Sequence, residues 1–206
     1  MRIDKKKIGF LEQNRSQKLG TSQYPVTIDD SDFVYFQLNF GGGFFFENAF
    51  LIYPNLQNSK SILDFNNINN LMKSCFCDLI KGALFWGCEI FGNQFAFKDG
   101  SFYFFNIETA EFEFMGNSFD EVVVLLKSET EYFTGKSLLL KWQESYGIIA
   151  NDERLCPKRP FVVGGEYEIN NLYKLNIGQL IKYNGALANK ISGLQDGTII
   201  DFEVTE

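Results

Sequence analysis

The chain has 206 residues, of which 45% are hydrophobic, and it contains no histidine. A chain of this length suits one domain whose core needs no disulfide or metal. Nineteen basic and 26 acidic residues give a net charge of −7, which argues against nucleic acid or an anionic membrane as the main target. The lack of histidine removes Ser-His-Asp triads, Cys-His pairs and HExxH zinc sites. Composition therefore predicts a soluble acidic domain that is not an enzyme.

The amino-terminal residues do not have the pattern of an export signal. Met1 to Lys7 is basic, but Gly9 interrupts the short apolar run that follows. No stretch of about 18 consecutive apolar residues occurs, so no membrane-spanning helix is expected. We expect a cytoplasmic protein whose four cysteines are reduced and packed as small hydrophobic side chains: Cys75, Cys77, Cys88 and Cys156.

The first half of the chain predicts helices interspersed with short strands. Residues 1–24 are polar and weakly patterned, and they predict an opening helix or an arm before the main domain, residues 25–206. Apolar residues spaced by three and four positions predict two helices, over residues 29–40 and 64–81. Aromatic and β-branched runs predict a hairpin over residues 44–53 and strands over residues 85–90, 95–97 and 102–107.

The second half continues this order. Glu111 to Met115 alternates strictly, which places acidic side chains on one face of a strand and Phe112 and Phe114 on the other. Ser118 to Glu121 is a capping box that opens a helix reaching Lys127. Further expected elements are a helix over residues 137–146, a loop between Pro157 and Pro160, a strand over residues 161–163, a helix over residues 177–191 and a strand over residues 198–204. Antiparallel strands interspersed with helices predict a single α+β domain.

Two motifs look like ligand sites but are better explained as structure. Thr134-Gly135-Lys136-Ser137 resembles the end of a phosphate-binding loop, but the glycine required five residues before Gly135 is replaced by Thr130. An ordinary helix start is expected there. Cys75 and Cys77 could begin a metal site, but on a helix they point to different faces, and no histidine completes the shell. No metal and no cofactor is predicted.

Acidic pairs such as Glu111 with Glu113 and Glu166 with Glu168 keep a carboxylate-based hydrolase as the least favoured alternative. Such an enzyme needs one carboxyl group that is buried and has a raised pKa. The alternation with phenylalanine predicts instead that Glu111 and Glu113 lie on a solvated strand face. A buried, paired carboxylate in a cleft would revive the enzymatic interpretation.

Taken in this order, the segments resemble the SUKH superfamily, the Smi/Knr-type domains of bacteria and fungi. Asp32 to Gly43, leading into Ala49 to Pro54, is similar to the helix, glycine turn and strand of that family. Glu89 to Phe95 is similar to its strand and turn, and Ser118 to Glu121 to the helix that follows its sheet. Residues 160–167 resemble an extension of longer bacterial members.

The resemblance implies a bent, mostly antiparallel sheet flanked by helices, and no catalytic residues. Many bacterial members are immunity proteins, each of which binds one toxin domain in the cytoplasm of the producing cell. We therefore expect a non-catalytic binding protein that neutralises a cognate polymorphic toxin. The alternative is a regulatory or scaffold module that binds another protein, as in fungal members. The resemblance does not predict the oligomeric state.

Acidic side chains are the candidate contacts with such a partner. Toxins that act on nucleic acid carry basic clefts, and a negatively charged protein associates with such surfaces quickly. The candidates belong to two clusters, one at the first helix start and one beside the sheet: Asp29, Asp30, Asp32, Glu108, Glu111 and Glu113. The competing interpretation is that these residues are solvated faces and that the aspartates serve as a helix cap.

Overall fold

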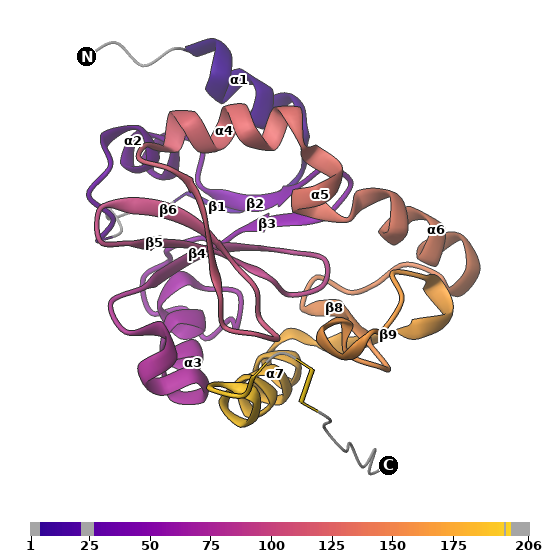
Figure 1. Ribbon diagram of the computed structural model, residues 1–206. Helices are drawn as coiled ribbons and strands as arrows, with labels where there is room; N and C mark the ends of the chain where they lie inside the picture. Colours follow the sequence, from indigo (N-terminus) through magenta and orange to yellow (C-terminus); the bar gives the residue numbers. More distant parts are fainter. Residues whose placement is uncertain (1–4, 22–26, 196, 199–206) are drawn as a thin grey trace.

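A computed structural model describes residues 5–21, 27–195 and 197–198 (Figure 1). Its centre is a seven-stranded sheet in which each strand pairs antiparallel with the next strand in the chain. The strands are β1 (Arg15–Gly20), β2 (Gly42–Phe45), β3 (Phe50–Ile52), β4 (Leu84–Glu89), β5 (Gln94–Lys98), β6 (Ser101–Phe105) and β7 (Phe112–Gly116). A separate hairpin consists of β8 (Glu153–Pro157) and β9 (Leu172–Asn176).

Helices lie on both sides of the sheet. Figure 1 shows α1, α2 and α4 along one side and α3 and α7 along the other. The α-helices are α1 (Lys5–Gln13), α2 (Ser31–Asn39), α3 (Phe65–Phe76), α4 (Phe119–Ser128), α5 (Thr130–Thr134), α6 (Lys136–Tyr146) and α7 (Ile177–Ile191). The predicted α+β class and single domain are confirmed.

Aromatic side chains fill the layers between the sheet and its helices. Trp86 of β4 packs against Phe33 of α2 with ring centroids 5.3 Å apart, and against Phe119 of α4 at 5.8 Å. On the other face, Phe105 of β6 packs against Phe76 of α3 at 5.4 Å. Edge-to-face pairs of this kind stabilise a core beyond the area that they bury. Aromatic contacts therefore hold helices on both faces.

The predicted helix starts near residues 29–32 and 118–121 are confirmed. One Asp30 oxygen accepts a hydrogen bond from the Phe33 amide at 2.7 Å, which caps α2. The other oxygen accepts from the Phe119 amide at 3.4 Å, in the first turn of α4. Ser118 caps α4 by accepting from the Glu121 amide at 3.3 Å. Asp30 thus links the starts of two helices.

The glycine run after α2 is required by a close backbone approach. Gly41 has a φ of 72°, and a Cβ there would lie 1.9 Å from the carbonyl oxygen of Gly20. No side chain fits at that distance. Because β1 and β2 pair at this point, Gly41 lets the chain leave α2 and enter the sheet.

The helix expected over residues 64–81 is shorter than predicted. The helix α3 ends at Phe76, and Cys77 has a φ of 50°, which is incompatible with a continuing α-helix. A 3-10 turn, η1 (Cys77–Ile80), follows. The expectation that all cysteines are buried was wrong for two of them, since Cys77 is exposed and Cys75 half-buried. Cys88 and Cys156 are buried, as predicted.

The strand predicted over residues 161–163 is a 3-10 turn, η2 (Phe161–Val163). The amides of Phe161 and Val162 donate to the carboxyl group of Glu108 at 3.1 and 2.7 Å instead of to a neighbouring strand. The strands in this region are β8 and β9, which the sequence did not predict, and a second 3-10 turn, η3 (Ile169–Asn171), precedes β9. A long-range contact therefore overrode a local apolar pattern.

The alternation along β7 is only partly what we expected. Glu113 is exposed, as predicted, but so is Phe114, with 55% of its surface accessible. The reason is position, because β7 is an edge strand of the sheet. Phe112 and Phe114 pack on Tyr103 of β6, with ring centroids 5.8 and 5.9 Å away.

The described part of segment 1–24 contributes α1 and β1, and β1 pairs with β2 as a strand of the main sheet. The last strand was expected over residues 198–204, and all of these positions after Thr198 lie outside the described residues.

Candidate functional site

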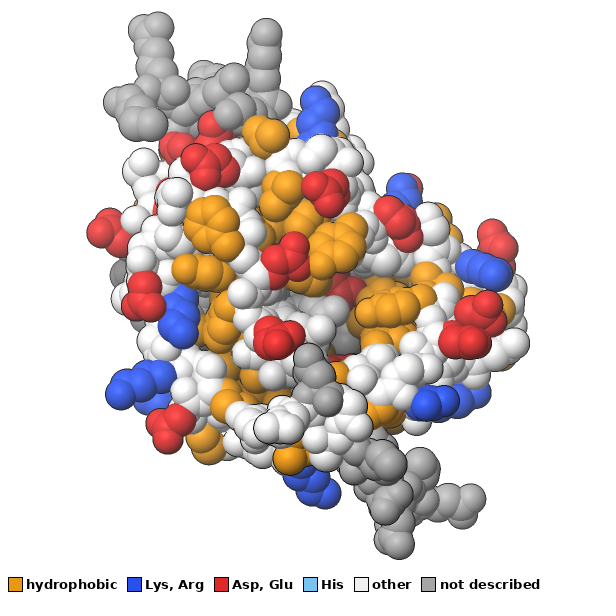
Figure 2. Space-filling view, viewed as in Figure 1, with side chains coloured by type: hydrophobic (Ala, Val, Ile, Leu, Met, Phe, Trp, Pro, Cys, Tyr) orange, Lys and Arg blue, Asp and Glu red, His pale blue; other side chains and the backbone are white. Residues whose placement is uncertain are grey.

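A cavity of about 560 Å³ opens between the end of the sheet, the α5–α6 segment and the loop after η2. Figure 2 shows a hollow near the middle of this face, with acidic and hydrophobic side chains around it. The lining residues come from four segments of the chain: Glu89, Phe91, Asn93, Phe104, Asn106, Glu131, Tyr132, Gly135, Ser137, Leu138, Lys141 and Tyr167. Its size is typical of small-ligand sites.

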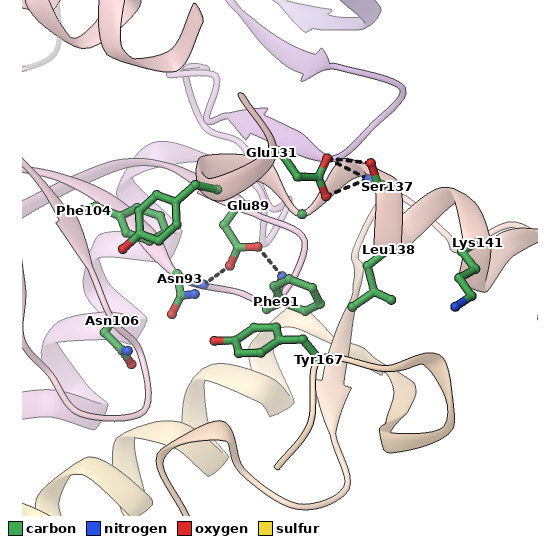
Figure 3. Close-up of a pocket in the computed structure, with 12 residues that line it drawn as sticks. Glu89, Phe91, Asn93, Phe104, Asn106, Glu131, Ser137, Leu138, Lys141 and Tyr167 are labelled. Carbon is green, nitrogen blue, oxygen red and sulfur yellow. Dashed lines mark hydrogen bonds between the residues drawn. The ribbon is translucent and has the colours of Figure 1, made fainter. Parts of the chain in front are cut away.

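The carboxyl group of Glu89 is the most deeply buried polar group of the cavity, with 1% of the residue exposed. Glu89 is the last residue of β4, and the tight turn that follows brings two backbone amides back to it. Its oxygens accept hydrogen bonds from the amides of Phe91 and Asn93, both at 2.8 Å (Figure 3). Gly92, with a φ of 89°, allows this turn.

The protonation of Glu89 is shifted by its surroundings. Burial raises the pKa of this carboxyl group to about 8, because the charged form loses its hydration. The two amide hydrogen bonds and the positive charge of Arg154 lower the pKa and offset part of this effect. Glu89 is therefore largely protonated at neutral pH.

Arg154 of β8 is the buried cation behind Glu89, and 1% of it is exposed. Its Nε lies 3.4 Å from the Cys88 sulfur, and its Nη1 donates to the carbonyl groups of Asn151 and Glu153. Its Nη2 has no hydrogen-bond partner among the described residues. Arg154 is thus held by the hairpin rather than by a direct ion pair with Glu89.

Aromatic rings make the side walls of the cavity. The Tyr167 ring stacks on Phe161 with centroids 3.8 Å apart and an angle of 5° between the planes. Phe91 meets Tyr167 edge to face at 5.8 Å, and Phe104 packs against Tyr132 at 6.1 Å. Figure 3 shows the Glu89 carboxyl group with Phe104 on one side and Phe91 and Tyr167 on the other.

Two carboxylates and two phenols form the rim. Glu131 accepts hydrogen bonds from the amide and the hydroxyl of Ser137, the latter at 2.7 Å, and so holds the start of α6. The Tyr132 hydroxyl donates to Glu113 at 2.7 Å, and this bond raises the pKa of Tyr132 to about 12. Burial, with the negative charges of Glu89 and Glu108, raises the pKa of Tyr167.

The acidic cluster predicted beside the sheet is divided by the fold. Glu111 and Glu113 are exposed, and Glu113 reaches the cavity rim through Tyr132. Glu108 is buried, with 4% exposed, because it anchors the amides of Phe161 and Val162. Burial raises the pKa of Glu108. Its carboxyl group is thus a structural anchor of the loop that carries Tyr167.

The aspartates at the start of α2 lie at the other end of β7 from Glu111. Asp30 caps α2 and also contacts the first turn of α4, which follows β7 directly. Asp29 is exposed, and Asp32 is half-buried in the first turn of α2. The structure therefore does not bring the two predicted acidic clusters into one site.

Sequence reasoning missed Glu89 and the two tyrosines. Glu89 ends an apolar strand and is followed by Phe91-Gly92-Asn93, so the available signal was one acidic residue between a buried run and a tight turn. The glycine motif near residue 135 does line the cavity, but as a helix start. A Cβ at Gly135 would lie 2.5 Å from the Phe91 ring.

Two further kinds of site, a cluster of metal ligands and a membrane-spanning helix, are absent from the part of the chain that the structure describes. No three His, Cys, Asp or Glu side chains are grouped there so that they could hold a metal ion. None of the helices in this part of the chain is long and apolar enough to cross a membrane.

Comparison with known proteins bears on the fold alone. No family model and no curated protein matches the chain. Among solved structures, the chain is similar to Atu4351 from Agrobacterium tumefaciens, with a TM-score of 0.56 and 13% sequence identity. The match covers 85% of this chain and 86% of that one. The α+β architecture is thus one that a solved protein also adopts over most of its length.

Proposed function

We propose that this chain is a non-catalytic binding protein of the cytoplasm that neutralises a cognate toxin by direct contact. The contact surface is the acidic face, which we define by five exposed residues. Glu131, Tyr132 and Tyr167 line the cavity, Glu113 accepts a hydrogen bond from Tyr132, and Glu111 lies two residues before Glu113 in the chain. The resemblance to SUKH immunity proteins supports the same class of function.

The observation that carries the proposal is the combination of exposed tyrosines with carboxylates on this face. More than half of the surface of Tyr132 and of Tyr167 is accessible, at 58% and 61%. Tyrosine is enriched at the centres of protein interfaces because its rigid ring buries a large area and its hydroxyl keeps a hydrogen bond. The carboxylates around these rings add charge recognition.

Charge points to a basic partner. The net charge of −7 and the acidic face attract a surface that is rich in arginine and lysine. A toxin that cleaves or modifies nucleic acid has such a surface at its substrate cleft, since it must neutralise phosphates. Occupying that cleft would block the toxin without any chemistry by this chain.

Binding explains the cavity better than catalysis does. A carboxylate hydrolase needs one protonated carboxyl group and a second that is free to attack or to activate water. Glu89 meets the first requirement, but Glu131, the other lining carboxylate, is bonded to the backbone and hydroxyl of Ser137. The pair is therefore used for structure and recognition.

Co-expression tests the proposal. The chain is expressed with the carboxy-terminal domain encoded by the neighbouring gene, and growth is scored. We expect rescue by the unaltered chain and loss of rescue with Glu111→Lys combined with Glu113→Lys. The matched control, Asp78→Lys with Glu144→Lys, changes the charge equally outside the acidic face and should rescue. Binding without rescue would favour the regulatory alternative, and no binding would overturn the proposal.

A further inference from the structure

The cavity behind the acidic face has the composition of a receptor for a planar cation. Its walls carry the rings of Phe91, Phe104 and Tyr167, and its deepest polar group is the Glu89 carboxyl group (Figure 3). Aromatic rings attract a cation placed over their faces, and a carboxylate supplies the opposite charge. The volume of about 560 Å³ leaves room for one side chain from a partner.

The charges around the cavity favour a cation over an anion. Two carboxyl groups line it, those of Glu89 and Glu131, and Glu113 lies next to it through Tyr132. Lys141 is the basic residue of the lining, and Figure 3 shows it beyond Leu138, on the side away from Glu89. An anion would therefore face several carboxylates, whereas a cation would be attracted to them.

Glu89 retains the capacity to bind a ligand. Each of its oxygens accepts one amide hydrogen bond, and each carboxylate oxygen can accept about two. The positive charge of Arg154 acts on Glu89 from the β8 side. Its Nε and Nη1 contact Cys88 and backbone carbonyls, and no hydrogen bond joins its guanidinium to Glu89 among the described residues. The lone pairs that remain on Glu89 are available to a donor in the cavity.

We propose that this cavity binds the guanidinium group of an arginine side chain that the protein partner inserts, with N–H groups on Glu89 and the guanidinium plane against the aromatic walls. The inference rests on the proposed function and names its central contact. Arginine fits better than lysine because its guanidinium is planar, weakly hydrated and able to stack on rings while it donates two hydrogen bonds.

Binding should release a proton, which gives the inference a pH signature. The charged and titratable groups around Glu89 are Arg154 from β8, Tyr167 from the loop after η2, and three residues of the α5–α6 segment that line the same cavity: Glu131, Tyr132 and Lys141. The pKa values of Tyr167 and Tyr132 are both raised above the ordinary value of 10, so neither phenol loses its proton between about pH 6 and pH 8. Because the pKa of free Glu89 is raised to about 8, affinity for a cation should rise at least about tenfold from pH 6 to pH 8.

The test uses N-acetyl-L-argininamide as the probe, with nuclear magnetic resonance as the readout. The backbone amides of Phe91 and Asn93 report directly, since they donate to Glu89. We expect saturable shifts of these signals that strengthen with pH. N-acetyl-L-citrullinamide, a neutral analogue of similar shape, should bind at least about tenfold more weakly. Equal binding of the two probes, or no shift with either, would overturn the proposal.

Variants locate the site. Glu89→Gln should lower the affinity for the probe at least about tenfold, and Tyr167→Leu should lower it about threefold or more. Glu144→Gln, on α6 but outside the cavity lining, should bind as the unaltered protein does. If Glu89→Gln does not fold, the pH series on the unaltered protein decides, and an affinity that does not change with pH overturns the proposal.

The source of the guanidinium is tested separately. The affinity of free L-arginine is compared with that of the capped probe. If free L-arginine binds more than about tenfold tighter, the cavity is a site for the free amino acid, and the proposal that a partner's side chain occupies it is overturned. The probes need no toxin, so the two proposals fail independently. Rescue in co-expression without probe binding overturns this inference alone, whereas probe binding without rescue overturns the toxin as partner.

Discussion

Burial of the Glu89 carboxyl group makes the stability of this protein depend on pH. In the unfolded chain the group titrates near its ordinary pKa of 4.5, and in the folded chain burial raises that pKa to about 8. Between these values the folded state holds a proton that the unfolded state has lost. The stabilising contribution is therefore complete below about pH 4.5 and is lost as the pH rises through about 8.

We predict that the free energy of unfolding falls between about pH 5.5 and about pH 8.5, measured by urea denaturation at each pH. Burial also raises the pKa of Glu108, so Glu108 likewise makes the free energy of unfolding fall as the pH rises. An amide hydrogen bond lowers the pKa of Glu153. Glu153 therefore changes the free energy of unfolding only at lower pH, outside this window. Glu89→Gln should flatten the pH dependence in part. A stability that rises across this window would contradict the assignment of Glu89 as a buried acid.

At the level of elements, Asp30 joins two helices that are far apart in the sequence. One oxygen accepts a hydrogen bond from the Phe33 amide in the first turn of α2. The other accepts from the Phe119 amide in the first turn of α4, and Phe119 lies 89 residues after Asp30 in the sequence. A helix cap contributes about 0.5–2 kcal/mol, and the contact with α4 adds to it. Asp30 was predicted as a partner contact or a cap, and its geometry favours the cap.

We predict that Asp30→Ala lowers the free energy of unfolding by about 1–2 kcal/mol, measured by urea denaturation. Asp29→Ala is the matched control, because it removes the same charge from an exposed neighbour. Its effect should stay within about 0.5 kcal/mol. Equal effects of the two substitutions would mean that charge rather than capping stabilises this end of α2.

A second prediction at this scale concerns the joint between α2 and the sheet. Gly41→Ala should lower the free energy of unfolding by about 2–4 kcal/mol. The new Cβ would clash with the backbone of Gly20, and the positive φ at this position is also unfavourable for alanine. Gly100→Ala is the control, because its φ of 82° is equally unfavourable but nothing lies within 4 Å of the added Cβ. Its cost should be about 1 kcal/mol. Similar costs would show that φ alone requires glycine at position 41.

For the whole molecule, the net charge of −7 sets how it approaches a partner. Opposite charges accelerate encounter, and salt screens them over a Debye length of about 10 Å at 0.1 M. For the toxin domain that we propose as partner, we predict an association rate that falls at least about tenfold between low and high salt, measured by stopped-flow fluorescence. Glu111→Lys with Glu113→Lys should reduce both the rate and its dependence on salt. An association rate that does not change with ionic strength would rule out steering by charge.

Local patterns were sufficient to predict the fold class, most helices and the hairpins of the main sheet. Helix spacing and the capping residues Asp30 and Ser118 act within a few residues, so they can be interpreted without the rest of the chain. Composition also excluded histidine chemistry outright. Where such patterns failed, at residues 161–163 and along β7, a distant carboxylate or an edge position was responsible.

The cavity could not be predicted in this way, because its residues come from segments up to 78 positions apart, from Glu89 to Tyr167. Nothing near Glu89 in the sequence shows that a hairpin and α5 will cover it, and its pKa depends on that cover. Exposed and buried acids also look alike in a sequence, as Glu108 and Glu111 demonstrate. Burial is a property of the assembled layers, and burial decides which carboxyl groups anchor loops and which face a partner.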